Sequence, residues 1–389
     1  MIATALALHS PRAVREALRA RGWDEARADA AAGGLGPCAV ELAGLTEAEV
    51  AVLLPQAREL GLEILTGEDW AVVAGSLSRL SALARPWGGP PELARVAAEL
   101  GGVLPAEPAR GWVTARGPLP LERPVIAGIL NVTPDSFSDG GRFLSPDAAL
   151  AHADRLLADG AAILDVGGES TRPGSEPVPA DEELHRVIPV IEALARRHPA
   201  VPISVDTVKS RVARAALEAG AAIINDVSGF RLDPAMAQVA AAAGAGVILM
   251  HSRGTVSTMA LLDQATYEPD VVTAVKAELR ERLEAAMAAG VALDHIVLDP
   301  GFGFAKTAEQ NLLLCDRLGS LLALGRPLLV GPSRKRFLGS VTGREIPERD
   351  VATAAACVMA YERGARLFRV HNVAVTRDAL AVAVAVRGE

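Results

Sequence analysis

Polar or charged side chains stand where one short apolar run after another ends in this sequence. Their types are those that bind anions, metal ions or polar heterocycles. The residues are Asn131, Asp165, Arg172, Asp206, Asn225, Asp226, His251, Asp299, Lys335, Arg369 and His371. Any one of them could cap a helix or form a turn, and we favour that role for Asp165 and Asp226. Their repetition after every apolar run favours a shared binding site.

The side chains fall into two groups according to the ligand that they suit. One group suits an anion, because arginine binds phosphate oxygens in pairs and a carboxamide can ligate a hard cation: Arg172, Arg369, His371 and Asn131. The other group suits a heterocycle and consists of Asp206, Asn225, Asp299 and Lys335. A carboxylate accepts from two adjacent ring N–H groups, an amide donates and accepts, and an ammonium donates to a ring acceptor. The alternative is that these side chains form structural ion pairs. The carboxylates could pair with lysine, and Arg369 could pair with a carboxylate.

The run from Gly301 to Thr307 superficially resembles a nucleotide-binding loop. Lys306 stands where the third glycine of a dinucleotide fingerprint belongs, and the spacing of a P-loop is also absent, so we expect no nucleotide there. The glycines are expected to let the backbone pass close to a flat ligand. His251 is expected to be a buried histidine with satisfied hydrogen bonds and not a catalytic group.

Short strands that alternate with amphipathic helices must position these residues. The strands are expected at Val125–Val132, Ala162–Val166, Ile203–Val205, Ala222–Asn225, Val247–Met250, Ile296–Leu298, Leu328–Val330 and Leu367–Val370. Such alternation produces a parallel sheet, and residues 125–389 have the usual length of a (β/α)8 TIM barrel. In a barrel, the residues just past the strands meet at the face that holds the active site. A doubly wound open sheet is the alternative, but it normally has fewer units in this length.

Residues 1–100 are expected to form a small α/β accessory domain of unknown role, with no polar constellation that indicates chemistry. Its strands are predicted at Thr4–Leu8, Ala39–Leu42, Leu62–Leu65 and Ala71–Val73, and its helix at Thr46–Leu60 with a Thr46–Glu49 capping box. Glycine and proline punctuate residues 101–124, which we interpret as a linker or wrapping segment. A chain that begins near Gly117 is therefore expected to fold and to retain activity.

Composition excludes several classes of protein. The formal charge of −8, from 39 basic and 47 acidic residues, argues against a basic nucleic-acid-binding face, and 3% aromatic residues against a stacking platform. The three cysteines are far apart, so neither a disulfide framework nor a zinc cluster is indicated. The longest apolar run, Val239–Met250, is shorter than the roughly 18 residues of a membrane span. We expect a soluble, cytoplasmic protein without nucleic-acid or membrane partners.

Several motifs resemble those of the dihydropteroate synthase family. Gly128–Gly141 is similar to the first signature of that family, and Leu164–Gly174 to the second. Shorter blocks follow in the family's order at Ser204–Thr207, Ile224–Val227, Asp299–Phe304, Ser333–Lys335 and Arg369–His371. The resemblance covers residues 120–389, and the length of the first two motifs makes it specific.

The resemblance implies a transferase of folate biosynthesis that uses Mg²⁺. Such an enzyme joins 6-hydroxymethyl-7,8-dihydropterin diphosphate to 4-aminobenzoate and releases 7,8-dihydropteroate and pyrophosphate. Family members are often homodimers. Charge neutralisation of the leaving diphosphate and positioning would carry the catalysis, and the neutral arylamine needs no strong general base.

The resemblance also implies roles for individual residues. Asn131 would contact Mg²⁺ on the diphosphate, and Thr171, Arg369 and His371 would line the diphosphate and nearby sites. The pterin would be held by Asp206, Asn225, Asp299 and Lys335. The aminobenzoate pocket would be shaped by Phe137, Arg172, Pro173 and Phe304, with Arg336 near the carboxylate. Catalytic roles would fall to Asn131, Lys335, Arg369 and His371.

The sequence departs from the family's pattern in three places. Arg336 stands where many members have serine, and Asn372 follows His371 where aspartate is common. The N-terminal extension carries no pyrophosphokinase or aldolase signature. Two other functions remain alternatives: a methyltransferase that uses methyltetrahydrofolate and a corrinoid partner, and a pterin-binding regulatory protein without turnover. Pyrophosphate release would distinguish the synthase from both.

Overall fold

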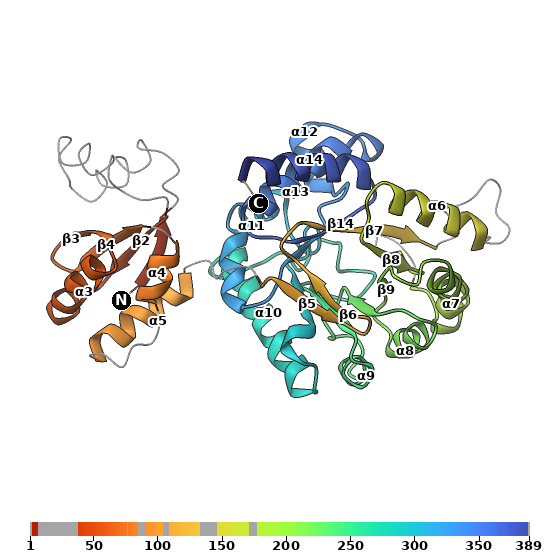
Figure 1. The fold of residues 1–389 in the computed structure, drawn as a ribbon, viewed down its shortest axis with the longest axis horizontal. Coiled ribbons are helices and arrows are strands. Elements are labelled where there is room, and N and C mark those ends of the chain that lie inside the picture. The colour runs from red at the N-terminus through yellow and green to blue at the C-terminus, as the bar shows by residue number, and fades with distance from the viewer. Residues whose placement is uncertain are drawn as a thin grey trace. The chain divides into compact units, whose positions relative to one another are not determined.

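The apolar runs predicted as strands after residue 124 all belong to one parallel sheet (Figure 1). They are β7 (Val125–Asn131), β8 (Ile163–Gly167), β9 (Ile203–Asp206), β10 (Ile223–Asp226), β11 (Gly246–Met250), β12 (Ile296–Asp299), β13 (Leu329–Val330) and β14 (Leu367–Val370). Their order is β12-β11-β10-β9-β8-β7-β14-β13. A parallel bridge between Leu298 and Leu328 joins the two outer strands. The sheet is therefore a closed barrel of eight strands, as predicted, and not an open sheet.

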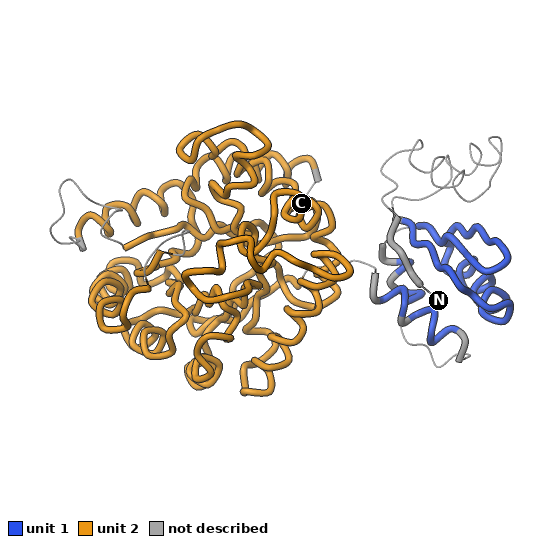
Figure 2. Tube along the Cα trace, turned by 180° about the vertical axis from the view of Figure 1, so that it is seen from behind, with its two compact units in different colours: residues 1–106 blue, residues 107–389 orange. Residues whose placement is uncertain are grey.

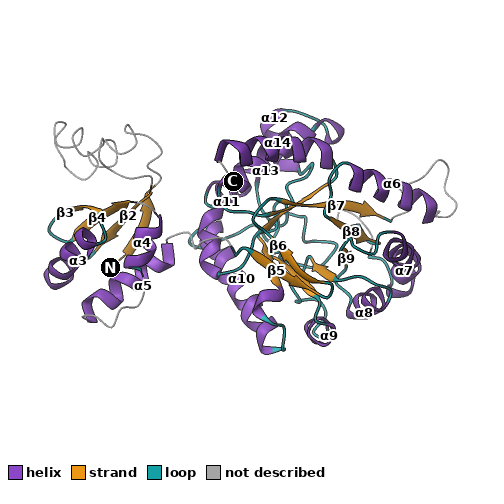
Figure 3. Cartoon of the chain, viewed as in Figure 1, coloured by secondary structure: helices purple, strands orange, loops and turns teal. Residues whose placement is uncertain are grey.

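Helices surround this sheet (Figure 3). The computed structural model describes residues 2–6, 38–75, 77–84, 91–103, 109–132, 146–170 and 177–387. Within these, the helices of the barrel are α6 (Pro146–Ala158), α7 (Ala180–Arg197), α8 (Ser210–Glu218), α9 (Met236–Ala243), α10 (Val271–Ala288), α11 (Ala308–Asp316), α12 (Arg336–Thr342), α13 (Asp350–Glu362) and α14 (Val373–Arg387). Thr307 and Gln310 form the capping box that starts α11, which satisfies backbone N–H groups that the helix leaves unpaired.

The strands are apolar because both faces of a barrel sheet are covered. Val125, Ile163, Ile223 and Val297, near the starts of four strands, belong to one buried cluster inside the barrel. The composition changes at the other end of the strands. Asparagine or aspartate ends β7, β9, β10 and β12, so polar side chains gather at the carboxyl end of the sheet.

A hairpin of β5 (Gly111–Thr114) and β6 (Gly117–Pro120) packs against the amino ends of the barrel strands. Trp112 is fully buried, and its indole N–H donates to the carbonyl of His295, just before β12, at 2.7 Å. A Cβ on Gly246, the first residue of β11, would lie 3.0 Å from the Trp112 ring. Residues 111–120 thus form a hairpin that packs on the barrel, which agrees with the wrapping segment, one of the two interpretations of residues 101–124.

The chain divides into two compact units, Met1–Ala106 and Glu107–Glu389 (Figure 2). The boundary thus lies before the hairpin and not beyond residue 124. Helix α5 (Pro91–Val103) of the first unit also extends into the stretch predicted as a linker.

The first unit is a small α/β unit, as predicted. Its antiparallel sheet has the order β1-β2-β4-β3, formed by β1 (Ile2–Leu6), β2 (Cys38–Ala43), β3 (Glu63–Thr66) and β4 (Trp70–Gly75). Besides α5, its helices are α3 (Glu47–Glu59), which starts at the predicted Thr46–Glu49 capping box, and α4 (Leu77–Leu83). The residues 7 and 8 of the first predicted strand lie outside the described residues. Across both units, none of the described helices has the length and apolar character needed to cross a membrane.

Candidate active site

A pocket opens at the carboxyl end of the barrel sheet. Its walls are formed by Asp206, Asn225, Val227, Met250, Asp299, Phe302, Phe304, Gly331, Lys335 and Arg369. All four residues predicted to suit a heterocycle are among them, together with Arg369 and Phe304. Strand ends or the turns that follow them supply these residues, which explains how a span of 164 positions converges on one site.

Arg369 joins two carboxylates at the base of this pocket. Its Nε donates to Asp165 Oδ2 at 2.5 Å, and a terminal nitrogen donates to Asp206 Oδ2 at 2.6 Å. Asn225 Nδ2 lies 3.3 Å from the same oxygen of Asp165. The pairing of Arg369 with carboxylates inside the barrel, one of the two alternatives from the sequence, is therefore present.

The expected role of Asp165 in a cap or turn is wrong. Its side chain is buried and belongs to the ion pair with Arg369. The sequence did contain a signal, because a carboxylate flanked by Leu164 and Val166 in a fully buried strand needs a partner. For Asp226 the expectation is confirmed, since it accepts from the N–H and hydroxyl of Ser228 at 2.7 Å each and from the Phe230 N–H at 3.2 Å.

Burial shifts the pKa values of the charged groups in the pocket. It raises the pKa of Asp299 to about 6 and, against the attraction of Arg369, it also raises the pKa of Asp206. Burial, with repulsion by Arg369, lowers the pKa of Lys335 to about 8. For Arg369 burial acts in the opposite direction, but Asp165 and Asp206 outweigh it and raise the pKa. Such a group of shifted carboxylates and cations in a cleft is typical of a functional site.

The ammonium of Lys335 lies over the ring of Phe304, 3.9 Å from its centre. Phe304 belongs to the glycine-rich turn after β12, whose backbone is tied by hydrogen bonds. The Gly301 N–H donates to Asp299 Oδ1 and the Gly303 N–H to Asn311 Oδ1, both at 2.7 Å. The flat wall beside Lys335 is therefore held in place by the chain itself.

The glycines of this turn allow a close approach to the protein's own groups. At Gly301, with φ of 69°, a Cβ would lie 1.9 Å from the carbonyl oxygen of His251. At Gly303, with φ of 80°, it would lie 2.8 Å from the Lys335 side chain. The sequence predicts that these glycines let the backbone approach a ligand. At Gly301 and Gly303 the backbone instead approaches His251 and Lys335 of the protein itself.

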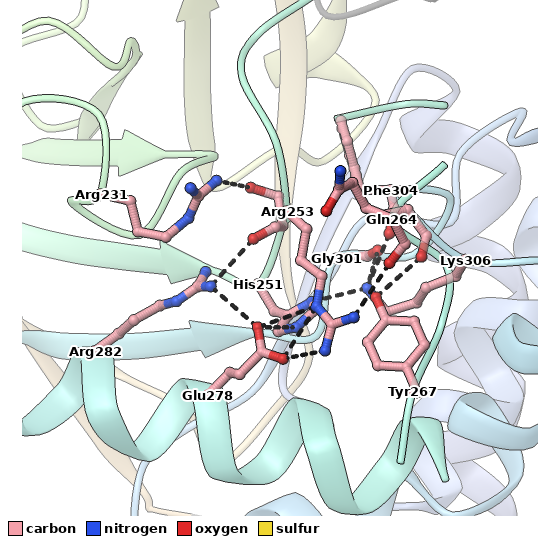
Figure 4. A network of polar contacts seen from close by, with 12 residues as sticks. Arg231, His251, Arg253, Gln264, Tyr267, Glu278, Arg282, Gly301, Phe304 and Lys306 are labelled. Atoms are coloured by element: carbon pink, nitrogen blue, oxygen red, sulfur yellow. Dashed lines mark hydrogen bonds and ion pairs between the residues drawn. The ribbon is translucent and has the colours of Figure 1, made fainter. Parts of the chain in front are cut away.

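A buried polar network lies behind this turn (Figure 4). Lys306 Nζ donates to the carbonyls of Gly301 and Phe304, each at 3.1 Å, and lies 3.0 Å from His251 Nδ1. His251 Nε2 lies 3.1 Å from Glu278 Oε2, so both ring nitrogens have partners, as expected. Burial lowers the pKa of Lys306 to about 7. The network fixes the backbone from which Phe304 extends.

Asn131 and His371 come from the same end of the barrel but do not line this pocket. His371 Nδ1 lies 2.9 Å from Ser333 Oγ, which also accepts the His371 N–H at 3.1 Å. Asn131 Oδ1 and Asp206 Oδ2 lie 3.8 and 3.7 Å from the point that a Cβ on Gly167 would occupy. Bare backbone at Gly167 therefore leaves space beside these two oxygens.

Five further site residues were expected from the sequence, and the structure describes one of them. Arg336 is exposed at the start of α12 and does not line the pocket. Phe137, Thr171, Arg172 and Pro173 lie outside the described residues. Sequence reasoning missed Asp350, whose carboxylate contacts both Arg334 and Asn372. An aspartate that opens a helix gives no sign of such partners.

Comparison with known proteins identifies similar sequences over the barrel. Residues 127–371 match the family described as pterin binding enzyme. The chain is 47% identical over 253 residues to a dihydropteroate synthase of Synechocystis sp., covering 65% of this chain and 86% of that protein. The Bacillus subtilis dihydropteroate synthase is 47% identical over 252 residues, 65% of this chain and 85% of the relative.

Solved structures give the same result. The dihydropteroate synthase of Xanthomonas albilineans with 4-aminobenzoic acid aligns with a TM-score of 0.67 and 48% identity, covering 72% of this chain and 99% of that one. The same enzyme in complex with 7,8-dihydropteroate aligns with a TM-score of 0.63 and 47% identity, covering 70% and 97%. With its barrel, its pocket and the match over residues 127–371, the chain belongs to the family of pterin binding enzymes.

Proposed function

We propose that the barrel acts as a dihydropteroate synthase through the pocket at the carboxyl ends of its strands. It condenses 6-hydroxymethyl-7,8-dihydropterin diphosphate with 4-aminobenzoate, forming 7,8-dihydropteroate and pyrophosphate. The observation that carries this proposal is the convergence of Asp206, Asn225, Asp299 and Lys335 on one pocket. These side chains together offer the acceptors and donors that the polar edge of a pterin requires. Dihydropteroate synthases at 47% identity support the same activity.

Asp299 and Lys335 orient the pterin through complementary hydrogen bonds, one as an acceptor and the other as a donor. The Asp299 carboxylate accepts from ring N–H groups, and the Lys335 ammonium donates to a ring acceptor. Lys335 already lies over the Phe304 ring, so its position is set before the substrate binds. Preorganisation of this kind lowers the entropic cost of binding the substrate in the reactive geometry.

Arg369 has two roles in this proposal. Its ion pairs with Asp165 and Asp206 neutralise carboxylates that would otherwise face each other unpaired. Its positive charge also stabilises the diphosphate as negative charge builds up on the leaving group. His371, held by Ser333, serves the same diphosphate end. No side chain has to remove a proton from the nucleophile, because the arylamine attacks as a neutral group.

Mg²⁺ fits the anion end of the site. Asn131 would hold the ion through its carboxamide oxygen, a type of ligand that Mg²⁺ accepts. Mg²⁺ keeps several waters and takes substrate phosphate oxygens as ligands, so it needs few ligands from the protein. When bound, Mg²⁺ supplies Lewis-acid stabilisation of the departing pyrophosphate.

The aminobenzoate site includes Phe304 and extends to Phe137, Arg172 and Pro173, as the resemblance implies, while Thr171 belongs to the diphosphate and nearby sites. Arg336, the exposed residue directly after Lys335, would bind the carboxylate of the aminobenzoate. Arginine suits that task because its planar group binds carboxylates through two hydrogen bonds.

The protein forms a homodimer through α13 and α14 in this proposal. These helices pack side by side and expose apolar residues, among them Val351 at 75% and Val386 at 82%. Apolar side chains exposed on two neighbouring helices suit burial against a second copy of the chain. Sedimentation should report a dimer, and Val386→Glu with Val382→Glu should give a monomer.

The test of the function is pyrophosphate release. The full chain is mixed with the pterin diphosphate, 4-aminobenzoate and Mg²⁺, and each component is left out in turn. We expect release only with both organic substrates present, and dihydropteroate in equal amount. Binding of the pterin without any pyrophosphate release would instead support the regulatory alternative.

A further inference from the structure

Asp350, the first residue of α13, connects two loops of the candidate site from outside the pocket. Its Oδ1 accepts from Arg334 Nε at 2.7 Å, and its Oδ2 accepts from a terminal nitrogen of Arg334 at 2.9 Å. The same Oδ2 accepts from Asn372 Nδ2 at 2.9 Å. Arg334 directly precedes Lys335, and Asn372 directly follows His371. One carboxylate thus links the loop after β13 to the loop after β14.

The backbone at Arg334 needs this support. Its φ is 57°, in the left-handed region that side chains other than glycine rarely adopt. Three residues at the start of α13 hold it there. The Arg334 N–H donates to Thr353 Oγ1 at 3.0 Å, its carbonyl accepts from Arg349 at 3.2 Å, and its guanidinium pairs with Asp350. Strained backbone of this kind persists where the surroundings over-determine it, commonly at functional sites.

The side-chain amide of Asn372 makes two hydrogen bonds, one through its oxygen and one through its nitrogen. Its Oδ1 accepts the Val375 N–H at 3.2 Å and so caps α14, while its Nδ2 donates to Asp350. An aspartate at this position could cap the helix but would place a second carboxylate against Asp350. The amide is therefore the side chain that suits a neighbouring carboxylate.

We infer that Asp350 is a positioning residue that holds the Lys335 and His371 loops in register. Lys335 meets the pterin and His371 the diphosphate, so the distance between the two loops sets how the substrate spans the site. The hydrogen bonds from Arg334, opposed by burial and reinforced by Asn372, keep the pKa of Asp350 below its ordinary value. The carboxylate consequently stays ionised through the neutral pH range. This inference rests on the proposed synthase activity.

An exchange of the two side chains tests the inference. The single variants Asp350→Asn and Asn372→Asp are compared with the double variant that carries both substitutions. The first single variant loses the charge that pairs with Arg334, and the second sets two carboxylates against each other. The double variant restores one carboxylate and one amide in exchanged places. We expect kcat to fall about tenfold or more in each single variant, because misplacing reacting groups slows the reaction steeply, and to recover largely in the double variant.

The split between kinetic constants separates positioning from a purely structural role. KM for 4-aminobenzoate should change less than kcat, and every variant is assayed below its melting transition. Asp316→Asn is the matched control, because Asp316 pairs at 2.8 Å with Arg363 beyond the other end of α13, far from both loops. It should leave kcat unchanged.

Two results would overturn the inference: wild-type kcat in folded Asp350→Asn, or a double variant no faster than the slower single one. If Asp350→Asn does not fold, Asn372→Ala removes the donor to Asp350 and leaves the Arg334 pair intact. Its kcat should still fall, and an unchanged value would count against the inference. Absence of synthase activity in the unmodified protein would instead contradict the proposed function.

Discussion

The guanidinium of Arg369 and the carboxylate of Asp206 lie 2.6 Å apart at the base of the pocket, and Asp165 meets the same guanidinium at 2.5 Å. Arg369 is thus a structural cation in the ligand-free protein. Any diphosphate that binds it must share the guanidinium with these carboxylates. Turnover and stability are therefore coupled at this residue.

Arg369→Ala should reduce both stability and pterin affinity. The substitution leaves Asp165 and Asp206 buried without their counter-charge, which typically costs roughly 3 kcal/mol or more of unfolding free energy. Denaturation and calorimetry with free hydroxymethylpterin and with its diphosphate measure both effects. Arg369→Lys is the control, since it keeps the charge and loses the paired geometry. An Arg369→Ala protein of normal stability that binds hydroxymethylpterin normally would contradict the structural role.

Asp299→Asn should raise the melting temperature at pH 7 while it weakens pterin binding. Burial raises the pKa of Asp299 from 3.8 to about 6, so the folded protein holds this proton more tightly than the unfolded chain. The unfolding free energy therefore falls as pH rises from about 4 to above 6, and asparagine avoids that loss. Its amide oxygen can still accept the Gly301 N–H.

Melting curves at pH 4 and pH 7 check this prediction, because the gain should be present only at the higher pH. Affinity for hydroxymethylpterin should fall at pH 7, by roughly 2–3 kcal/mol, since the charge-assisted hydrogen bonds of the carboxylate are lost. Unchanged pterin affinity would remove Asp299 from the pterin site.

Pterin affinity should be greatest between about pH 6 and pH 8. Below this window Asp299, with a pKa of about 6, takes up a proton and loses acceptor capacity. Above it Lys335, with a pKa of about 8, loses the proton that it donates. Calorimetry across the pH range measures the profile. Lys335→Met should flatten the alkaline limb, whereas Asp299→Asn should flatten the acid limb only in part, because burial raises the pKa of Asp206 as well.

A chain that starts at Gly117 should fail to form a stable barrel, contrary to the expectation from the sequence. It lacks β5 and with it Trp112, which is fully buried against the barrel. A chain that starts at Glu107 keeps the whole hairpin and is the matched control. Thermal melting should show a cooperative transition for the longer chain and a weakened or absent one for the shorter. Equal melting temperatures would mean that the hairpin is dispensable.

The strands and the polar face of the barrel could be predicted because their signals are local. Short apolar runs that end in Asn131, Asp206 or Asp299 predict buried strands with polar residues at their carboxyl ends. The hairpin could not be recognised, since glycine and proline mark linkers and tight hairpins alike, and the partner of Trp112 lies 183 residues further along the chain.

The site could be predicted as a set of residues but not as a set of contacts. Residue type indicates that Arg369 binds an anion, yet not whether the anion is a ligand or Asp165. Asp350 is a stronger case. At the start of a helix an aspartate is favoured by the helix dipole in any protein, so its contacts with Arg334 and Asn372 have no signature in the sequence.

The hairpin at the amino ends of the strands constrains the order in which the molecule is built. On the ribosome, residues emerge from the N-terminus onward, so Trp112 is synthesised long before Gly246 and His295, the residues on which it packs. Until β11 and β12 have left the exit tunnel, this indole lacks the residues on which it packs and must remain in water or in transient contacts. Burial of Trp112 is thus a late event in the synthesis of the chain, and a ribosome that stalls before residue 295 carries a nascent chain in which this side chain is still exposed.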